Sequence, residues 1–196
     1  MGERILLAVL IAMSFQVAQA RAEFSQGYLA KLLRNKIESA QDLAANEAVM
    51  RAVLRQNERN ASLEEIGEID KEWTSTKEFT PFKESLQENE IGRFFKTLVT
   101  FEHATYSEII LTDRQGANVA TYPTTTDYWQ GDERKWIEAF EDGGKVYIGP
   151  VTFDESTEMD SVQVSVPVMA DGKPIGVLIV GIKLTWLQGK YLKDRQ

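Results

Sequence analysis

The first half of the chain has the apolar spacing of helices. Between Gln26 and Gln56, apolar residues recur every three or four positions, which is typical of one long amphipathic helix. Ser62 and Glu65 have the spacing of a capping box, which predicts the start of a second, shorter helix. Thr80 followed by Pro81 predicts a third helix. A fourth is expected where apolar residues cluster again, at Ile91, Phe94, Phe95, Leu98 and Val99.

After Tyr106 the apolar period changes to two, the period of a half-buried strand. A Gly-containing turn joins two expected strands, and a short helix at 132–141 follows them and ends at Gly143 and Gly144. The five expected strands are 108–112, 118–122, 145–153, 162–168 and 175–183. Helices first and then about five antiparallel strands predict a single α+β domain. The alternation also predicts one core that contains Leu111, Val164, Val166 and Ile179.

The first twenty residues have the pattern of a secretory signal. Arg4 precedes the apolar run Ile5–Phe15, and Ala18-Gln-Ala20 matches a signal cleavage pattern. The run is too short for a membrane span, which needs about 20 apolar residues. An uncleaved N-terminal anchor is the alternative. We therefore expect cleavage after Ala20 and a periplasmic or secreted mature protein of residues 21–196.

Charge and composition exclude several classes of function. A formal net charge of -8 argues against binding to nucleic acid or to an anionic membrane surface. The absence of Cys excludes disulfides and thiolate metal sites, and the single His, His103, removes most metal and general-base schemes. No Walker, Rossmann, G-x-S-x-G or H-E-x-x-H string occurs. We therefore expect no catalytic residue, no cofactor and no metal.

The segment 122–157 carries a dense set of aromatic and charged residues between expected strands. Loops on a rigid sheet with such side chains suggest a pocket for a small polar ligand. Arg134 or Lys135 could hold a ligand carboxylate, and because they are adjacent only one is expected to face the pocket. Alternatively both are solvated helix residues, with Arg134 paired to Glu138 four positions on.

Further side chains of this segment complete the expected pocket. Tyr128 and Trp136 could form apolar walls, although Trp136 could equally pack the core beneath its helix. Tyr147 could present its hydroxyl, and Asp154 could turn inward to orient a basic pocket residue. The acidic turn 154–160 could attract a hard cation, but its spacing matches no calcium loop, and a solvated hairpin tip is expected.

This layout resembles the PAS-like extracytoplasmic sensor domains called PDC or Cache. The matching strings are Leu43–Asn57, Ile110–Asp113 with Gly116, Thr126–Glu133 with Lys135 and Trp136, Phe153–Thr157, Val166–Val168 and Ile175–Leu178. The resemblance implies a long N-terminal helix packed on a five-stranded antiparallel sheet, with ligands bound over the sheet. It also implies one Cache domain over 21–196, with a helical part at 21–106 and the sheet with its inserted helix at 107–196.

Amino-acid-binding members of the family use a Tyr, then Arg-x-Trp-Tyr, with a further Tyr and Asp downstream. Tyr128, Arg134 and Trp136 match in order, but Tyr128 lies one residue too far upstream and Ile137 replaces the second aromatic residue. Near Gly181, where those members carry the Asp that binds the ligand amine, this chain has no carboxylate. The resemblance therefore implies a ligand carboxylate without an amine.

These observations lead to one main hypothesis and two alternatives. The main hypothesis is a secreted or periplasmic sensory domain that binds a small carboxylate or related metabolite and acts through a membrane receptor or transporter. The N-terminal helix could also mediate a homodimer. The first alternative is a non-catalytic accessory or structural protein that works by protein–protein contact, and a carboxylate-based hydrolase is the second.

Overall fold

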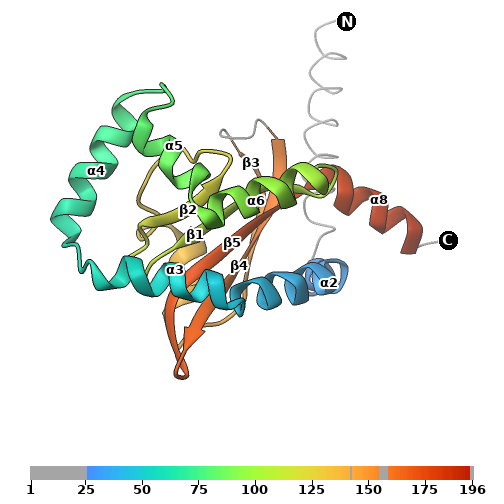
Figure 1. Cartoon of the computed structure of the whole chain (residues 1–196). Coiled ribbons are helices and arrows are strands. Elements are labelled where there is room, and N and C mark those ends of the chain that lie inside the picture. The colour runs from blue at the N-terminus through green and yellow to red at the C-terminus, as the bar shows by residue number, and fades with distance from the viewer. Residues whose placement is uncertain (1–25, 142, 155–158, 195–196) are drawn as a thin grey trace, which may run out of the picture.

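The computed structural model describes residues 26–141, 143–154 and 159–194 (Figure 1). The expected signal sequence, its cleavage site after Ala20 and most of the acidic turn lie outside these residues. In the described part, five helices precede the sheet, one is inserted within it and one follows it. The helices are α2 Gln26–Ala44, α3 Glu47–Glu58, α4 Leu63–Ser75, α5 Pro81–Glu88, α6 Glu90–Phe101, α7 Arg134–Phe140 and α8 Leu184–Asp194.

The helix boundaries follow local capping signals. Ser62 and Glu65 form the expected capping box at the start of α4, and Thr80 caps α5 with Pro81 in its first turn. The expected single helix over 26–56 is wrong, because the chain divides there into α2 and α3. Asn46 causes the break: its backbone is extended, and its Oδ1 accepts the backbone N–H of Ala48 at 2.9 Å.

The expected five-stranded antiparallel sheet is confirmed. Its strands are β1 Tyr106–Thr112, β2 Asn118–Tyr122, β3 Tyr147–Asp154, β4 Met159–Ala170 and β5 Lys173–Lys183. They lie in the order β2-β1-β5-β4-β3, so β2 and β3 form the edges and β5 is central. Every neighbouring pair is antiparallel.

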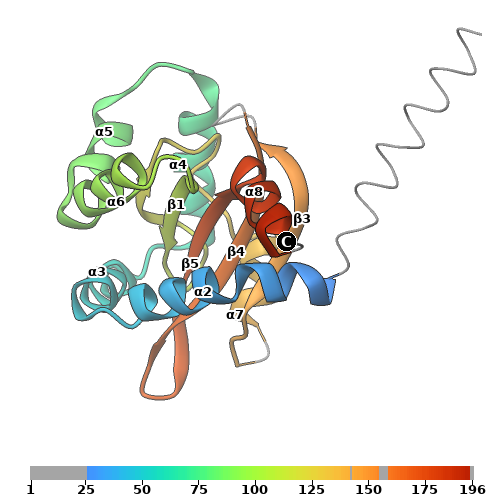
Figure 2. The ribbon, with the colours of Figure 1, turned by 90° about the vertical axis from the view of Figure 1, so that its right-hand side faces the viewer.

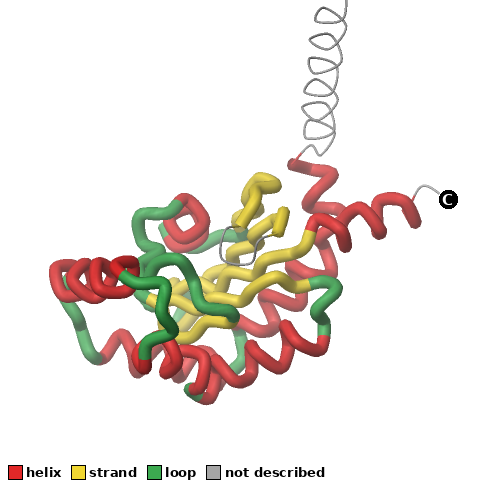
Figure 3. Tube along the Cα trace, turned by 90° about the horizontal axis from the view of Figure 1, so that it is seen from above, coloured by secondary structure: helices red, strands yellow, loops and turns green. Residues whose placement is uncertain are grey.

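Helices cover the two faces of the sheet unequally. The main core lies on the face covered by α2, α3, α6 and α8, where α2 crosses β5 and β4 (Figure 2). Seen from above, helices run along one side of the strands (Figure 3). The opposite face, here called the α7 face, packs against α7 through Ile110, Val177 and Ile179.

Strand alternation assigns each buried residue to one of these faces. Leu111, Val164, Val166 and Ile179 are all fully buried, as expected. The first three belong to the main core, whereas Ile179 lies on the α7 face. The expectation of one shared core is therefore wrong, because β5 is central and apolar on both of its faces.

Candidate functional site

Helix α7 brings Trp136 onto the sheet. The side chains of Trp136 and Ala139 are buried against Ile110 and Ile179. The indole Nε1–H of Trp136 donates to the backbone oxygen of Asp113 at 3.4 Å. Trp136 is thus a packing residue of the α7 face, which is the second of the two roles expected for it.

The two expected cationic residues occupy different environments on α7. The Arg134 side chain is 77% exposed, with its Nε 3.3 Å from a Glu138 carboxylate oxygen and its guanidinium 5.7 Å from the centre of the Tyr147 ring. The Lys135 side chain is only 13% exposed, and its Nζ lies 3.1 Å from Glu133. Arg134 is therefore a surface cation beside Tyr147, and Lys135 is the more buried one.

Tyr128 lies in a different cluster from Trp136. Its ring contacts those of Trp73 and Phe82, with centroids 5.9 and 5.4 Å away. Its hydroxyl accepts a hydrogen bond from Nε2 of Gln56 on α3 at 3.2 Å. The structure therefore brings Arg134, Trp136 and Tyr147 together on the α7 face and places Tyr128 on the side of α3, α4 and α5.

Asp154 is the last residue of β3, where it pairs with Met159 of β4. The pocket role expected for its side chain lies outside what the structure describes. For the part of the chain in 26–141, 143–154 and 159–194, no group of three His, Cys, Asp or Glu side chains is placed to hold a metal ion.

The loop that leads into α7 is held by carboxylates. Asp70 of α4 accepts the backbone N–H groups of Tyr128 and Trp129 at 2.8 and 3.0 Å. Asp127 accepts a hydrogen bond from the amide of Gln130, whose side chain is fully buried. Burial raises the pKa of Asp127 to about 6. This loop therefore contains a carboxyl group whose pKa lies well above that of an ordinary Asp.

A set of polar residues, four of them buried and Gln163 half-buried, lies on the α7 face where β1 begins and β5 ends. We call this set the polar patch; its members are Ser107, Glu108, Ser161, Gln163 and Ser165. Glu108 is only 2% exposed, and its Oε1 accepts a hydrogen bond from Gln163 Nε2 at 2.8 Å. The patch thus places a carboxylate in the interior with an amide donor beside it.

The hydroxyl groups of the polar patch have no hydrogen-bond partner among the residues that the structure describes. The Oγ atoms of Ser107, Ser161 and Ser165 are buried and bond to none of the described residues. A buried polar group without a partner costs about 1–3 kcal/mol. Such groups are usually satisfied by water or by a ligand. The patch therefore has free capacity for hydrogen bonds with a polar molecule.

Gly181 makes room for the carboxylate of this patch. A Cβ atom at position 181 would lie 2.2 Å from Ser107 Oγ and 2.7 Å from Glu108 Cγ. The neighbouring strand β1 thus supplies a carboxylate where the sequence pattern predicted none. Sequence reasoning missed Glu108, although it is the single charged residue of the strand Tyr106–Thr112.

No helix in the part of the chain that the structure describes is long and apolar enough to cross a membrane. No curated protein matches the sequence.

Solved sensor domains are similar to this chain. The sensory domain of the Campylobacter jejuni chemoreceptor Tlp3 with isoleucine bound is 18% identical in sequence, with a TM-score of 0.42. The match covers 87% of this chain and 68% of the Tlp3 chain. The sensor domain of the V. cholerae histidine kinase DctB is 14% identical, with a TM-score of 0.37, over 84% of this chain and 60% of that one.

Residues 68–189 match the family described as methyl-accepting chemotaxis protein-like, first PDC sensor domain. The matched region contains α5, α6, α7 and all five strands of the sheet. The expected PDC/Cache assignment and its α+β fold are therefore confirmed. Because the match covers more than half of the chain, this protein belongs to the family of methyl-accepting chemotaxis protein-like PDC sensor domains.

Proposed function

We propose that this sensory domain binds a small metabolite that carries a carboxylate and an ammonium group, on the α7 face, and performs no chemistry. The observation that carries the proposal is the buried polar patch, with the Glu108 carboxylate and three unpartnered hydroxyl groups. A ligand ammonium group could join the Gln163 amide as a hydrogen-bond donor to the buried Glu108 carboxylate. The hydroxyl groups could then accept or donate the remaining ligand hydrogen bonds.

The cation that would hold the ligand carboxylate comes from α7. Arg134 is the better candidate, because its surface pair with Glu138 is weak and its guanidinium already lies over the Tyr147 ring. Tyr147 pairs with Ser165 across β3 and β4, so this cation and the polar patch share one face of the sheet. Lys135 is the second candidate, and its pairing with Glu133 would have to open first.

Entry of the ligand requires a change in the α7 face. Glu108 and the unpartnered serines are buried, and Ser107 and Glu108 fill the space beside Gly181. A ligand would replace these contacts and displace part of the cover. A sensor needs such a change in conformation on binding. A ligand can shift the equilibrium between two conformations only if its affinities for them differ.

The cellular setting is part of the same proposal. We place the mature domain in the periplasm or outside the cell, where it would act through a membrane receptor or transporter. The signal-like first twenty residues and the sensor family support this setting. A homodimer through the N-terminal helical region remains a prediction, for which gel filtration with light scattering is the measurement.

A thermal-shift screen of amino acids, amines and organic acids tests the binding proposal. A ligand present at 100 times its Kd should stabilise the native state by about 2.7 kcal/mol. Glu108→Gln should weaken an amine-bearing hit at least tenfold while keeping the acceptor for Gln163, and Arg134→Ala should weaken it through the carboxylate. Arg51→Ala is the matched control, because Arg51 is an exposed residue of α3 that pairs with Glu47.

The screen also separates the proposal from the accessory-protein alternative. If no compound raises the melting temperature, or if affinity survives both Glu108→Gln and Arg134→Ala, the α7 face is not the binding site. If the cellular phenotype also survives the combined substitution of Arg134, Lys135 and Trp136, the accessory-protein alternative would be favoured.

A further inference from the structure

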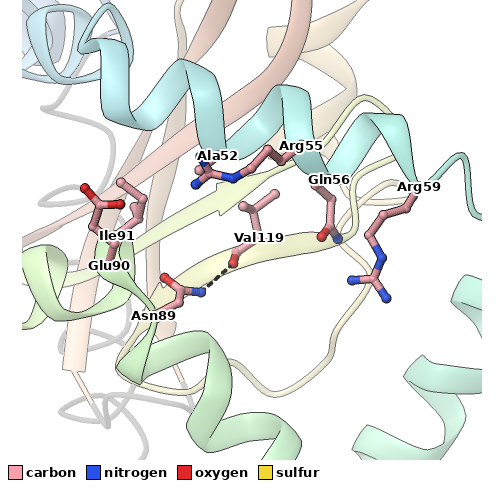
Figure 4. Close-up of a pocket in the computed structure, with 8 residues that line it drawn as sticks. All are labelled: Ala52, Arg55, Gln56, Arg59, Asn89, Glu90, Ile91 and Val119. Atoms are coloured by element: carbon pink, nitrogen blue, oxygen red, sulfur yellow. Dashed lines mark hydrogen bonds between the residues drawn. The ribbon is translucent and has the colours of Figure 1, made fainter.

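A cavity lies on the other face of the sheet from α7, beside the edge strand β2. It has a volume of about 270 Å³, comparable to the lower end of small-ligand sites. Helix α3 forms one wall, the junction of α5 and α6 another, and β2 the floor (Figure 4). The lining residues are Ala52, Arg55, Gln56, Arg59, Asn89, Glu90, Ile91 and Val119.

Two guanidinium groups, those of Arg55 in α3 and of its C-cap residue Arg59, line this cavity without acidic partners among the described residues. Arg51, Arg55 and Arg59 follow one another at intervals of four residues, so they lie along one side of the helix. Arg51 pairs with Glu47 at 3.0 Å, but neither Arg55 nor Arg59 forms an ion pair with a carboxylate in the described ranges. Like charges at this spacing destabilise a helix. Arg55 and Arg59 therefore lack a neighbouring carboxylate such as Glu47, which offsets the charge of Arg51.

Two polar side chains of the lining, Gln56 and Asn89, are held in place by the fold. Gln56 donates to the Tyr128 hydroxyl at 3.2 Å. Asn89 donates to the backbone oxygen of Val119 at 3.0 Å, and its own Oδ1 accepts the backbone N–H of Gly92 at 2.8 Å. Ala52 and Val119 are almost fully buried and form an apolar base. The cavity is thus preorganised, with cations at its mouth and a rigid lining between them.

We propose that this cavity is a second ligand site and binds a small dicarboxylate. The guanidinium groups of Arg55 and Arg59 lie on either side of the Gln56 amide (Figure 4). One carboxylate of a short diacid would pair with each guanidinium, and its methylene groups would pack on Ala52 and Val119. Arginine suits this role because its planar fork matches a carboxylate.

Glu90 places a negative charge at one end of the cavity, and the effect of this charge on binding can be tested. Arg59 and Glu90 stand at opposite ends of the lining (Figure 4). Glu90 is an exposed first-turn residue of α6, where a negative charge stabilises the helix. Its carboxylate repels a dianion in the cavity. Glu90→Gln should therefore tighten dicarboxylate binding several-fold.

Isothermal titration calorimetry of the full chain with glutarate is the experiment. Butyrate is the control ligand, since it has a similar length and only one carboxylate, and inorganic phosphate tests a compact anion. Glutarate should bind at least tenfold more tightly than butyrate or phosphate. Arg55→Gln and Arg59→Gln should each weaken glutarate at least tenfold, whereas Arg51→Gln on the same helix should leave the affinity unchanged.

The outcome separates this site from the one on the α7 face. The affinity for glutarate should be unchanged in Glu108→Gln, whether or not the α7 face binds a ligand. Circular dichroism of each variant confirms that the helices remain folded. No measurable heat with millimolar glutarate, tighter binding of phosphate than of glutarate, or equal affinity in both folded arginine variants would each overturn the proposal.

Discussion

Asp127 should make the stability of this domain depend on pH in an unusual direction. Burial raises its pKa to about 6, and the nearby Glu133 carboxylate adds to the increase, whereas the Gln130 hydrogen bond and Lys135 oppose it. An unperturbed Asp has a pKa of about 3.9. Between these two values the folded state holds a proton that the unfolded state has lost.

The sign and size of the effect follow from linkage between proton binding and folding. The stabilisation from the protonated Asp127 is fully present below about pH 4 and is lost as the pH rises through about 6. The difference in pKa corresponds to at most about 3 kcal/mol, because each unit is worth about 1.36 kcal/mol, and solvent screening of this half-buried carboxyl group reduces that figure. This loss adds to the contributions of all other titrating groups, so it must be isolated by a substitution.

Asp127→Asn isolates it, because the amide stays neutral and keeps an oxygen that accepts from Gln130. At pH 7.5 the variant should have a free energy of unfolding up to about 3 kcal/mol above that of the wild type, and near pH 4 the two should be equal. Urea denaturation followed by tryptophan fluorescence measures both, with equal m-values as the two-state check. Asp132→Asn, at an exposed position of the same loop, is the matched control. A gain that does not change with pH, or a destabilised variant at pH 7.5, would refute the reasoning.

Further predictions address the two faces, the helix break and the leader. Ile179→Ala should lower the free energy of unfolding by about 2–5 kcal/mol, and an unchanged urea midpoint would show that the α7 face is not packed as described. Asn46→Ala should cost about 0.5–2 kcal/mol in the same assay, and no loss would remove its assigned capping role. Gly181→Ala should displace Glu108 and weaken the binding of amine-bearing ligands in a variant that still folds. An unchanged affinity would show that Glu108 does not belong to the site. N-terminal sequencing of the periplasmic protein should begin at Arg21, and an intact Met1 in the membrane fraction would contradict cleavage.

Local signals allowed much of the helical part to be predicted. The capping box at Ser62 and Glu65 and the cap at Thr80 depend on hydrogen bonds between residues three apart, so the sequence contains both partners. The break at Asn46 was missed because the apolar period continues from α2 into α3. An Asn followed by an acidic first-turn residue, Glu47, is the signal that could have shown it.

The site was only partly predictable, because its members meet through strand register. Arg134 and Trp136 lie on one short helix, and their position beside Tyr147 follows from a helix that folds back onto the next strand. The pairing of Glu108 with Gln163, by contrast, joins residues 55 positions apart and requires β5 between β1 and β4. A shift of one residue in either register would turn these side chains to opposite faces. No local pattern contains that information.

The serines of the polar patch in β4 are buried, although the alternation along this strand predicts that they are exposed. Val162, Val164 and Val166 belong to the main core, and the alternation alone predicts that Gln163 and Ser165 lie on an exposed face. In the structure Ser161 and Ser165 are nevertheless 1% and 0% exposed. A strand buried on both sides is normally apolar on both, as β5 is around Ile179. Buried serines without partners reduce stability, and apolar residues at these positions would remove that cost. Water or a ligand can satisfy such hydroxyl groups, and this capacity is the physical basis for proposing the sensor site there.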